Sequence, residues 1–212
     1  MADLAGAGEP VMIAQLEHKP DLISFEEFLA SYDGVRAEWV DGKVEEMSPT
    51  SDRHADISDF LITLLRVLVA ETGAGVVRSS QVAMRLGQVA RVPDLLFLTA
   101  EHASRLTPSH VEGAADLAIE IVSPDSRHRD RKQKFMEYEQ AGVTEYWIVD
   151  PLREAVELYR LDEQGRYALV PPAGDPPRLS SAVVPRFWID PRWLWSSPMP
   201  DPMTVFREWG LI

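Results

Sequence analysis

The chain has 212 residues, of which 45% are hydrophobic and 26% charged, a balance typical of a globular protein with one core. It contains no cysteine, which excludes disulfides, thiolate metal sites and a cysteine nucleophile. Its formal net charge of −13 argues against non-specific coating of nucleic acid, because phosphate binding depends on Lys and Arg. Residues 1–15 lack a signal-peptide pattern and no apolar run approaches the roughly 20 residues of a membrane span. We therefore expect a cytoplasmic protein that makes no membrane contact.

The N-terminal part predicts an arm, a short helix, a hairpin and a long helix. Residues 1–23 show no periodicity. Ser24 and Glu27 have the spacing of a capping box, which predicts a helix from Phe25 to about Ser31. Asp41-Gly42 between residues 36–40 and 43–47 indicates a β-hairpin. A longer amphipathic helix then ends at Gly73 and Gly75, and its apolar residues recur at helical spacing: Ile57, Phe60, Leu61, Leu64, Leu65 and Leu68.

The middle of the chain reads as strands alternating with helical or polar segments. Residues 76–86 alternate enough to predict one strand, and residues 101–113 predict a loop or a short helix. Three apolar runs follow the pattern of strands covered on both faces, at 95–98, 117–122 and 146–149. Between the last two, residues 127–141 predict a basic helix that ends at Gly142. This order indicates an α/β protein with helices flanking a mixed sheet.

The C-terminal part predicts a β extension of the same domain. Residues 155–161 and 167–170 read as a second hairpin, and residues 179–184 as a further strand. The tail is rich in Trp and Pro, which suggests that it packs onto the domain or a neighbouring subunit. We divide the chain into an arm (1–23), a core domain (24–161) and C-terminal strands with the tail (162–212).

Two carboxylates stand in these apolar strands. Asp94 begins the first run and Glu120 lies between Ile119 and Ile121 in the second. A buried acid costs several kcal/mol or more unless it is paired, and a metal ion is one such partner. If the two strands are neighbours, both carboxylates can reach one hard cation such as Mg²⁺. The simpler alternatives are that Asp94 caps a turn and that Glu120 forms a structural salt bridge, for example to Lys134.

Further candidate residues surround this pair in sequence. Lys134 shares one side of the basic helix with Asp130 and Tyr138, and it could assist the chemistry or simply be a solvated helix residue. His54 borders an apolar stripe, where a hydrogen-bonded structural histidine is the alternative to a catalytic base. Glu38 lies on the first hairpin, as an additional ligand or an ordinary surface acid. The basic residues of the helix are either a solvated face or contacts to a nucleic-acid backbone, namely Arg127, Arg129, Arg131 and Lys132.

Several of these motifs together resemble a known family. Pro93-Asp94 and Glu120 in Ile-Glu-Ile-Val-Ser-Pro resemble the PD-(D/E)XK restriction-endonuclease-like superfamily, and more narrowly the Uma-type restriction-endonuclease family. The other matching motifs are Glu-Trp-Val-Asp-Gly at 38–42, Met-Ser-Pro at 47–49, His54, Lys-Phe-Met-Glu-Tyr at 134–138 and Glu-Tyr-Trp-Ile-Val-Asp-Pro at 145–151. The superfamily lysine normally lies two residues after the acid, where this chain has Val122. The resemblance implies that Lys134 takes that role, with Lys132 as second choice.

The resemblance also implies a fold and an activity. It implies a restriction-endonuclease-like mixed β-sheet flanked by helices. The implied activity is Mg²⁺-dependent hydrolysis of phosphodiester bonds, most plausibly of DNA, with Mn²⁺ as a substitute ion. Asp94 and Glu120 would hold the metal, while Lys134, Glu38 and His54 would complete the catalytic site. Cutting both strands would need two facing sites, hence a homodimer. The alternatives are a catalytically inactive nuclease fold that serves as an interaction module, and a hydrolase of a small phosphorylated substrate.

Overall fold

The computed structural model describes residues 22–32, 35–124 and 126–212, and most of the predicted N-terminal arm lies outside these ranges. The larger helices are α1 (Phe25–Ser31), α2 (Asp52–Thr72), α3 (Phe135–Ala141) and α4 (Pro202–Glu208). Short helical segments are η1 (Ala103–Arg105), η2 (Arg129–Lys134) and η3 (Pro191–Trp195). The strands are β1 (Ala37–Val40), β2 (Lys43–Glu46), β3 (Gly75–Ser79), β4 (Ala83–Leu86), β5 (Val89–Arg91), β6 (Leu95–Thr99), β7 (His110–Glu112), β8 (Leu117–Ile121), β9 (Glu145–Asp150), β10 (Ala155–Leu161), β11 (Tyr167–Val170), β12 (Leu179–Ser180) and β13 (Trp188–Ile189).

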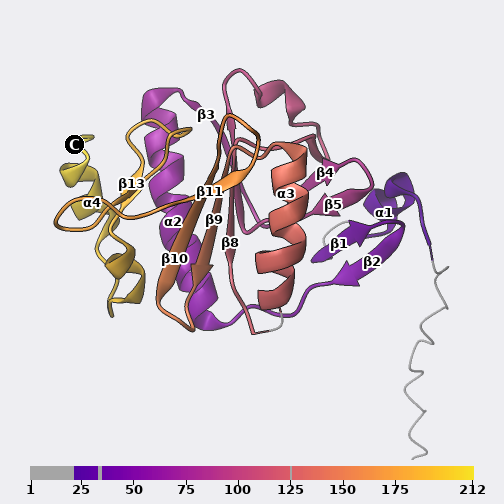
Figure 1. Ribbon diagram of the computed structural model, residues 1–212, viewed down its shortest axis with the longest axis horizontal. Coiled ribbons are helices and arrows are strands. Elements are labelled where there is room, and N and C mark those ends of the chain that lie inside the picture. Colours follow the sequence, from indigo (N-terminus) through magenta and orange to yellow (C-terminus); the bar gives the residue numbers. More distant parts are fainter. Residues whose placement is uncertain (1–21, 33–34, 125) are drawn as a thin grey trace, which may run out of the picture.

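A six-stranded mixed sheet forms the centre of the molecule, in the order β11-β10-β9-β8-β6-β3. Strands β8 and β9 are parallel and are connected through η2 and α3, while the other pairs are antiparallel. Helices α2 and α3 lie on opposite sides of this sheet (Figure 1). The mixed α/β class expected from the sequence is therefore confirmed.

Alternation along β6 and β8 explains how both faces of the sheet become buried. Leu95, Phe97, Leu117 and Ile119 pack against the apolar stripe of α2, whereas Leu96, Leu98 and Ala118 pack against Tyr138 of α3. Successive side chains of a strand point to opposite faces, so continuous apolar runs suit a sheet that is covered twice.

A second, five-stranded sheet lies beside the first, in the order β2-β1-β5-β4-β7 (Figure 1). It contains the predicted hairpin, where Asp41 and Gly42 both have positive φ angles, as their two-residue turn requires. Helix α1 packs on this sheet through Phe25 and Phe28, and it has the predicted capping box.

Three predictions about secondary structure differ from the structure. Residues 76–86 do not form one strand, because a turn after Ser79 separates β3 in the central sheet from β4 in the second sheet. The polar run Ser79-Ser80-Gln81 interrupts the apolar alternation at this point. The strand expected over 179–184 is only two residues long, and the polar segment 101–113 contains strand β7 besides the short helix η1.

The C-terminal tail covers the side of α2 that faces away from the sheet (Figure 1). Phe187, Val205, Phe206 and Trp209 are buried in the same cluster as the apolar stripe of α2. In the described part of the chain, no helix combines the length and the apolar character needed to cross a membrane.

Candidate active site

Asp94 and Glu120 lie on the same face of the central sheet. Leu95 pairs with Ile119 across β6 and β8, which places Asp94 beside the end of β8. The backbone N–H of Ile121 donates to Asp94 Oδ2 at 2.7 Å. Asp94 follows the alternation of Leu96, and Glu120 that of Ala118, so both carboxylates point to the α3 side. Each is about 3% exposed, and both line one small cavity of about 50 Å³.

Lys134 connects this pair to Glu38. Its Nζ lies 2.8 Å from Glu120 Oε1, 2.8 Å from Glu38 Oε1 and 3.7 Å from Asp130 Oδ1. The hydroxyl of Tyr138 also donates to Glu120 Oε1, at 2.8 Å. Among the described residues, none donates a hydrogen bond to Glu120 Oε2, so this oxygen is available to the cavity.

The helix that carries Lys134 is not a regular α-helix throughout. Residues 127–141 are helical as predicted, but Arg129–Lys134 form a π-helical segment. Such segments have hydrogen bonds between residues five positions apart instead of four, and they are frequent at functional sites. Here the segment buries Asp130 and Lys134 together, four positions apart, against the ends of the strands.

Glu38 is held in its ionised form. Burial by itself raises the pKa of this carboxyl, but the charges of Lys134 and Arg91 outweigh burial and lower the pKa to about 2. Arg91 Nη1 donates to Glu38 Oε2 at 2.9 Å, and the N–H of Val92 donates to Glu38 Oε1 at 3.1 Å. Arg91 also binds Glu137 of α3 with two hydrogen bonds, of 2.7 and 2.8 Å. This arginine therefore fixes the second sheet to the helix that carries Lys134.

Glu120 and Asp130 have too few positive charges nearby to offset the effect of burial on their pKa values. Burial, together with the nearby carboxylates of Asp130 and Asp94, raises the pKa of Glu120. Burial also raises the pKa of Asp130, whose Oδ1 is buried without a hydrogen-bond partner. The burial of Lys134 disfavours its charge, but Glu120 and Glu38 more than compensate, so its pKa is raised and it stays protonated.

A divalent cation fits this donor set. Mg²⁺ prefers carboxylate oxygens, keeps several of its waters, and is commonly bound through one or two carboxylates plus phosphate oxygens. Asp94 and Glu120 offer those two carboxylates, and an added positive charge would offset the repulsion among Glu120, Asp130 and Asp94. The described residues contain no cluster of three or more His, Asp or Glu side chains arranged to hold a metal.

His54 contacts Asp94 directly, with its Nε2 2.9 Å from Asp94 Oδ1. Ser51 caps the N-terminus of α2 by accepting a hydrogen bond from the backbone N–H of His54, which fixes the first turn of the helix. The Nδ1 atom of His54 is buried without a hydrogen-bond partner.

The four basic residues predicted to contact nucleic acid have different surroundings. Arg129 lines the cavity, with its Nε 3.7 Å from Glu38 Oε2. Lys132 is exposed and Arg127 is half-buried. Arg131 forms ion pairs with Asp150, at 2.9 Å, and with Glu157, so neighbouring acids compensate its charge.

Comparison with known proteins identifies the family. A model of the Uma2 family, described as "Putative restriction endonuclease", matches residues 25–192. The chain belongs to the Uma2 family. The resemblance seen in the sequence motifs is therefore confirmed.

The fold of this Uma2-family chain also matches a solved structure. A crystal structure described as a "putative nuclease belonging to DUF820", from Anabaena variabilis, superposes with a TM-score of 0.66 at 18% identity. The match covers 82% of this chain and 97% of that one. No curated protein matches the chain.

The Uma2-family site contains three residues that sequence reasoning did not assign to it. Arg36 lies 3.9 Å from Asp94 Oδ1, Arg91 binds Glu38, and Asp130 lies beside Lys134. The one available signal was the spacing of Asp130, Lys134 and Tyr138 along a single helix face. Arg36 and Arg91 lie next to motif residues in the sequence, but only the tertiary structure brings Arg36 to the cavity and Arg91 to Glu38.

Proposed function

We propose that this protein hydrolyses phosphodiester bonds of DNA with the help of Mg²⁺, for which Mn²⁺ can substitute. One observation carries the proposal: Asp94, just before β6, and Glu120 of β8 line one cavity beside the ammonium group of Lys134. The chain belongs to a family described as "Putative restriction endonuclease", which supports the same chemistry.

In this proposal Asp94 and Glu120 hold the metal ion. When bound, the ion supplies a Lewis acid that polarises the phosphate and lowers the pKa of a water molecule. Lys134 lines the cavity and stays charged, so it stabilises the negative charge that develops on the phosphate. It also holds Oε1 of Glu120, which leaves Oε2 for the metal.

Glu38 and His54 act as positioning residues in this proposal. Glu38 binds Lys134 from the side opposite to Glu120 and so keeps the ammonium group between two carboxylates. His54 restrains the carboxylate of Asp94. Arg127, Arg129 and Lys132 would contact the DNA backbone, whereas Arg131 would contribute less because Asp150 and Glu157 already bind it.

A plasmid-nicking assay tests the function. We expect the wild-type protein to convert supercoiled plasmid to open-circular or linear form with Mg²⁺ or Mn²⁺, and not with EDTA. The variants Asp94→Ala and Glu120→Ala should lose at least about a hundredfold in rate, because second-sphere changes alone cost about 10–100-fold at metal sites and these would remove ligands. Equal activity of the wild type and both variants would show that another site, or a contaminant, cuts the plasmid.

A second candidate function is an interaction module that keeps the nuclease fold without turnover. The closed network of Glu38, Lys134 and Glu120 favours it, because these groups already satisfy one another in part. Calorimetry with Mn²⁺ separates the two candidates. A nuclease should bind Mn²⁺, and either Asp94→Ala or Glu120→Ala should abolish that binding. An inactive module should show no Mn²⁺ binding that depends on these two acids.

We also propose that the protein acts as a homodimer if it cuts both DNA strands, since each strand then needs its own site. Sedimentation velocity at micromolar concentration should show a species of twice the chain mass of 23.8 kDa. A monomer at all concentrations would restrict the protein to nicking.

A further inference from the structure

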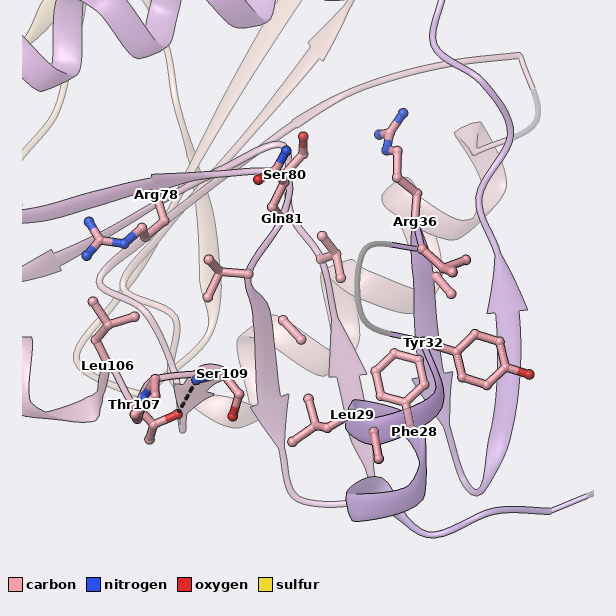
Figure 2. Close-up of a pocket in the computed structure, with 17 residues that line it drawn as sticks. Phe28, Leu29, Tyr32, Arg36, Arg78, Ser80, Gln81, Leu106, Thr107 and Ser109 are labelled. Atoms are coloured by element: carbon pink, nitrogen blue, oxygen red, sulfur yellow. Dashed lines mark hydrogen bonds between the residues drawn. The ribbon is translucent and has the colours of Figure 1, made fainter.

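A larger pocket lies next to the candidate active site and has no role in the proposed chemistry so far. It has a volume of about 890 Å³, within the range of roughly 300–1,000 Å³ that is typical of ligand sites. Its walls come from α1, the segment before β1, the β3–β4 turn and the segment 106–109 (Figure 2). The two sheets therefore form it jointly, since β3 and β4 belong to different sheets.

The charge of this pocket is opposite to that of the whole molecule. The chain has 34 acidic and 21 basic residues, yet none of the 17 described residues that line the pocket is Asp or Glu. Two are arginines, Arg36 and Arg78, which extend from opposite sides of the pocket in Figure 2. The only charges among its described lining residues are positive, and on an acidic protein such a concave surface favours an anionic ligand.

Arg36 joins this pocket to the candidate active site. It lines both the large pocket and the small cavity of Asp94 and Glu120. One of its terminal nitrogens lies 3.9 Å from Asp94 Oδ1, and its Nε is buried without a hydrogen-bond partner. The Arg36 side chain is 33% exposed and its ion pair with Asp94 is long, so its guanidinium at this junction is suited to a phosphate oxygen. A ligand with successive phosphates could then place one at Arg36 and another toward Arg78.

The rest of the lining suits nucleobases. The β3–β4 turn contributes the hydroxyl of Ser80 and the amide of Gln81, groups that can bind base edges. The opposite wall contributes apolar surface, including Leu29 and Leu106. In a duplex, bases are paired and stacked on one another, so their Watson–Crick edges and faces are not offered to such a pocket. In a single strand both are free.

We infer that this pocket binds an unpaired stretch of the DNA strand. Arg36 then binds a phosphate of this strand where the pocket meets the Asp94–Glu120 cavity. The inference rests on the proposed function for its choice of DNA. It adds that the substrate is single-stranded at the site, either as a free strand or as a frayed or branched end. It also helps to explain how a chain with a net charge of −13 can bind DNA, because the described residues that line this pocket include no acid.

Binding of a fluorescein-labelled 12-nucleotide single strand, measured by anisotropy in EDTA, tests the inference without turnover. We expect the wild type to bind the single strand at least tenfold more tightly than a blunt duplex of the same sequence. Arg78→Glu should weaken binding of the single strand at least fivefold. It should also reduce the salt dependence of log Kd by about 0.7, the value for one phosphate contact on a single strand. Ser80→Trp, which fills the pocket, should weaken binding to a similar extent.

Two matched variants serve as controls. Arg66→Glu reverses an exposed charge on α2, and Gln164→Trp adds an indole to the exposed β10–β11 turn. Neither should change Kd by more than about twofold. The inference is wrong if the duplex binds as tightly as the single strand, or if Arg78→Glu binds no more weakly than Arg66→Glu. Failure of the proposed function is a separate result, since it appears as absence of nicking that depends on Asp94 and Glu120, whether or not the strand binds.

Discussion

At the scale of single residues, Lys134 determines the electrostatics of the candidate site. It is 0% exposed and lies between Glu38 and Glu120, whereas Lys132, two positions earlier, is exposed. The family resemblance implied a lysine on the helix after Glu120, with Lys134 as the first candidate and Lys132 as the second. Only burial separates the ammonium group of Lys134, which is paired with two carboxylates, from the solvated side chain of Lys132.

Substitution of the two lysines should give very different results. Lys134→Met removes a charge from between buried carboxylates, and breaking such a pair typically costs about 3–5 kcal/mol. We expect the free energy of unfolding, measured with urea, to fall by about 3 kcal/mol, near the lower limit because Glu120 can take up a proton. Lys132→Met, on the surface, should change it by less than about 0.5 kcal/mol. A loss of equal size in both variants would contradict the buried network.

The acid sensitivity of the protein should depend on Glu38. Its pKa is lowered from 4.5 to about 2, which corresponds to about 3 kcal/mol. A carboxyl with a lowered folded pKa stabilises the fold fully above its unfolded pKa, and this contribution is lost as the pH falls through the folded pKa. The wild type should therefore lose about 3 kcal/mol through Glu38 between about pH 5 and pH 2.

The variant Glu38→Gln lacks this contribution at every pH. We expect its urea-measured stability to be lower than that of the wild type at pH 6 and to fall less steeply between pH 5 and pH 3. Glu163→Gln, on the exposed β10–β11 turn, is the control and should follow the wild-type curve. Parallel curves for the wild type and Glu38→Gln would show that Glu38 is not held ionised.

At the scale of elements, the register between β3 and β6 depends on a glycine. Gly75 pairs with Thr99, and a Cβ atom at Gly75 would lie 1.9 Å from the carbonyl oxygen of Leu98. Gly73, two residues earlier, is the left-handed C-cap of α2 with a φ of +62°, and a Cβ there would meet nothing within 4 Å. The two glycines thus have different reasons to lack a side chain.

Alanine at these two positions should separate a backbone clash from conformational strain. Gly73→Ala should cost about 1–2 kcal/mol, the usual penalty for a left-handed non-glycine residue. Gly75→Ala forces β3 away from β6 and should cost about 3 kcal/mol or more, at the upper end of overpacking effects. Thermal unfolding of both variants provides the measurement. If Gly75→Ala is the more stable of the two, β3 is not paired in this register.

Local sequence patterns were sufficient to predict several of these elements. The capping box of α1, the Asp41-Gly42 hairpin and the stripe of α2 are local signals, and each element forms where its signal lies. The break between β3 and β4 was missed because three polar residues within an alternating run resemble surface positions of a strand. The π-helical turn of η2 was also missed, since its residues differ in no local way from those of an α-helix.

At the scale of the whole molecule, one apolar cluster connects the central sheet, α2 and the C-terminal tail. On the other side, α3 and the second sheet enclose the candidate site through the ion pairs of Arg91 with Glu38 and Glu137. The site therefore lies where two sheets meet, and residues from both contribute to it. An acidic surface can coexist with a pocket whose described lining residues include no acid, because the local charge depends on the side chains that line each cavity.

The sequence by itself determined the α/β class and the pair of acids in apolar strands, because periodicity, turn residues and a charge within an apolar run are all visible along one chain. The resemblance of its motifs indicated the family. Only the tertiary structure decided which groups surround those acids. Asp130 and Arg36 reach the cavity, and Arg91 reaches Glu38, through strand pairing and helix packing between segments far apart in sequence. The pocket beside the site has the same origin, since its walls come from segments that become neighbours only when the two sheets assemble.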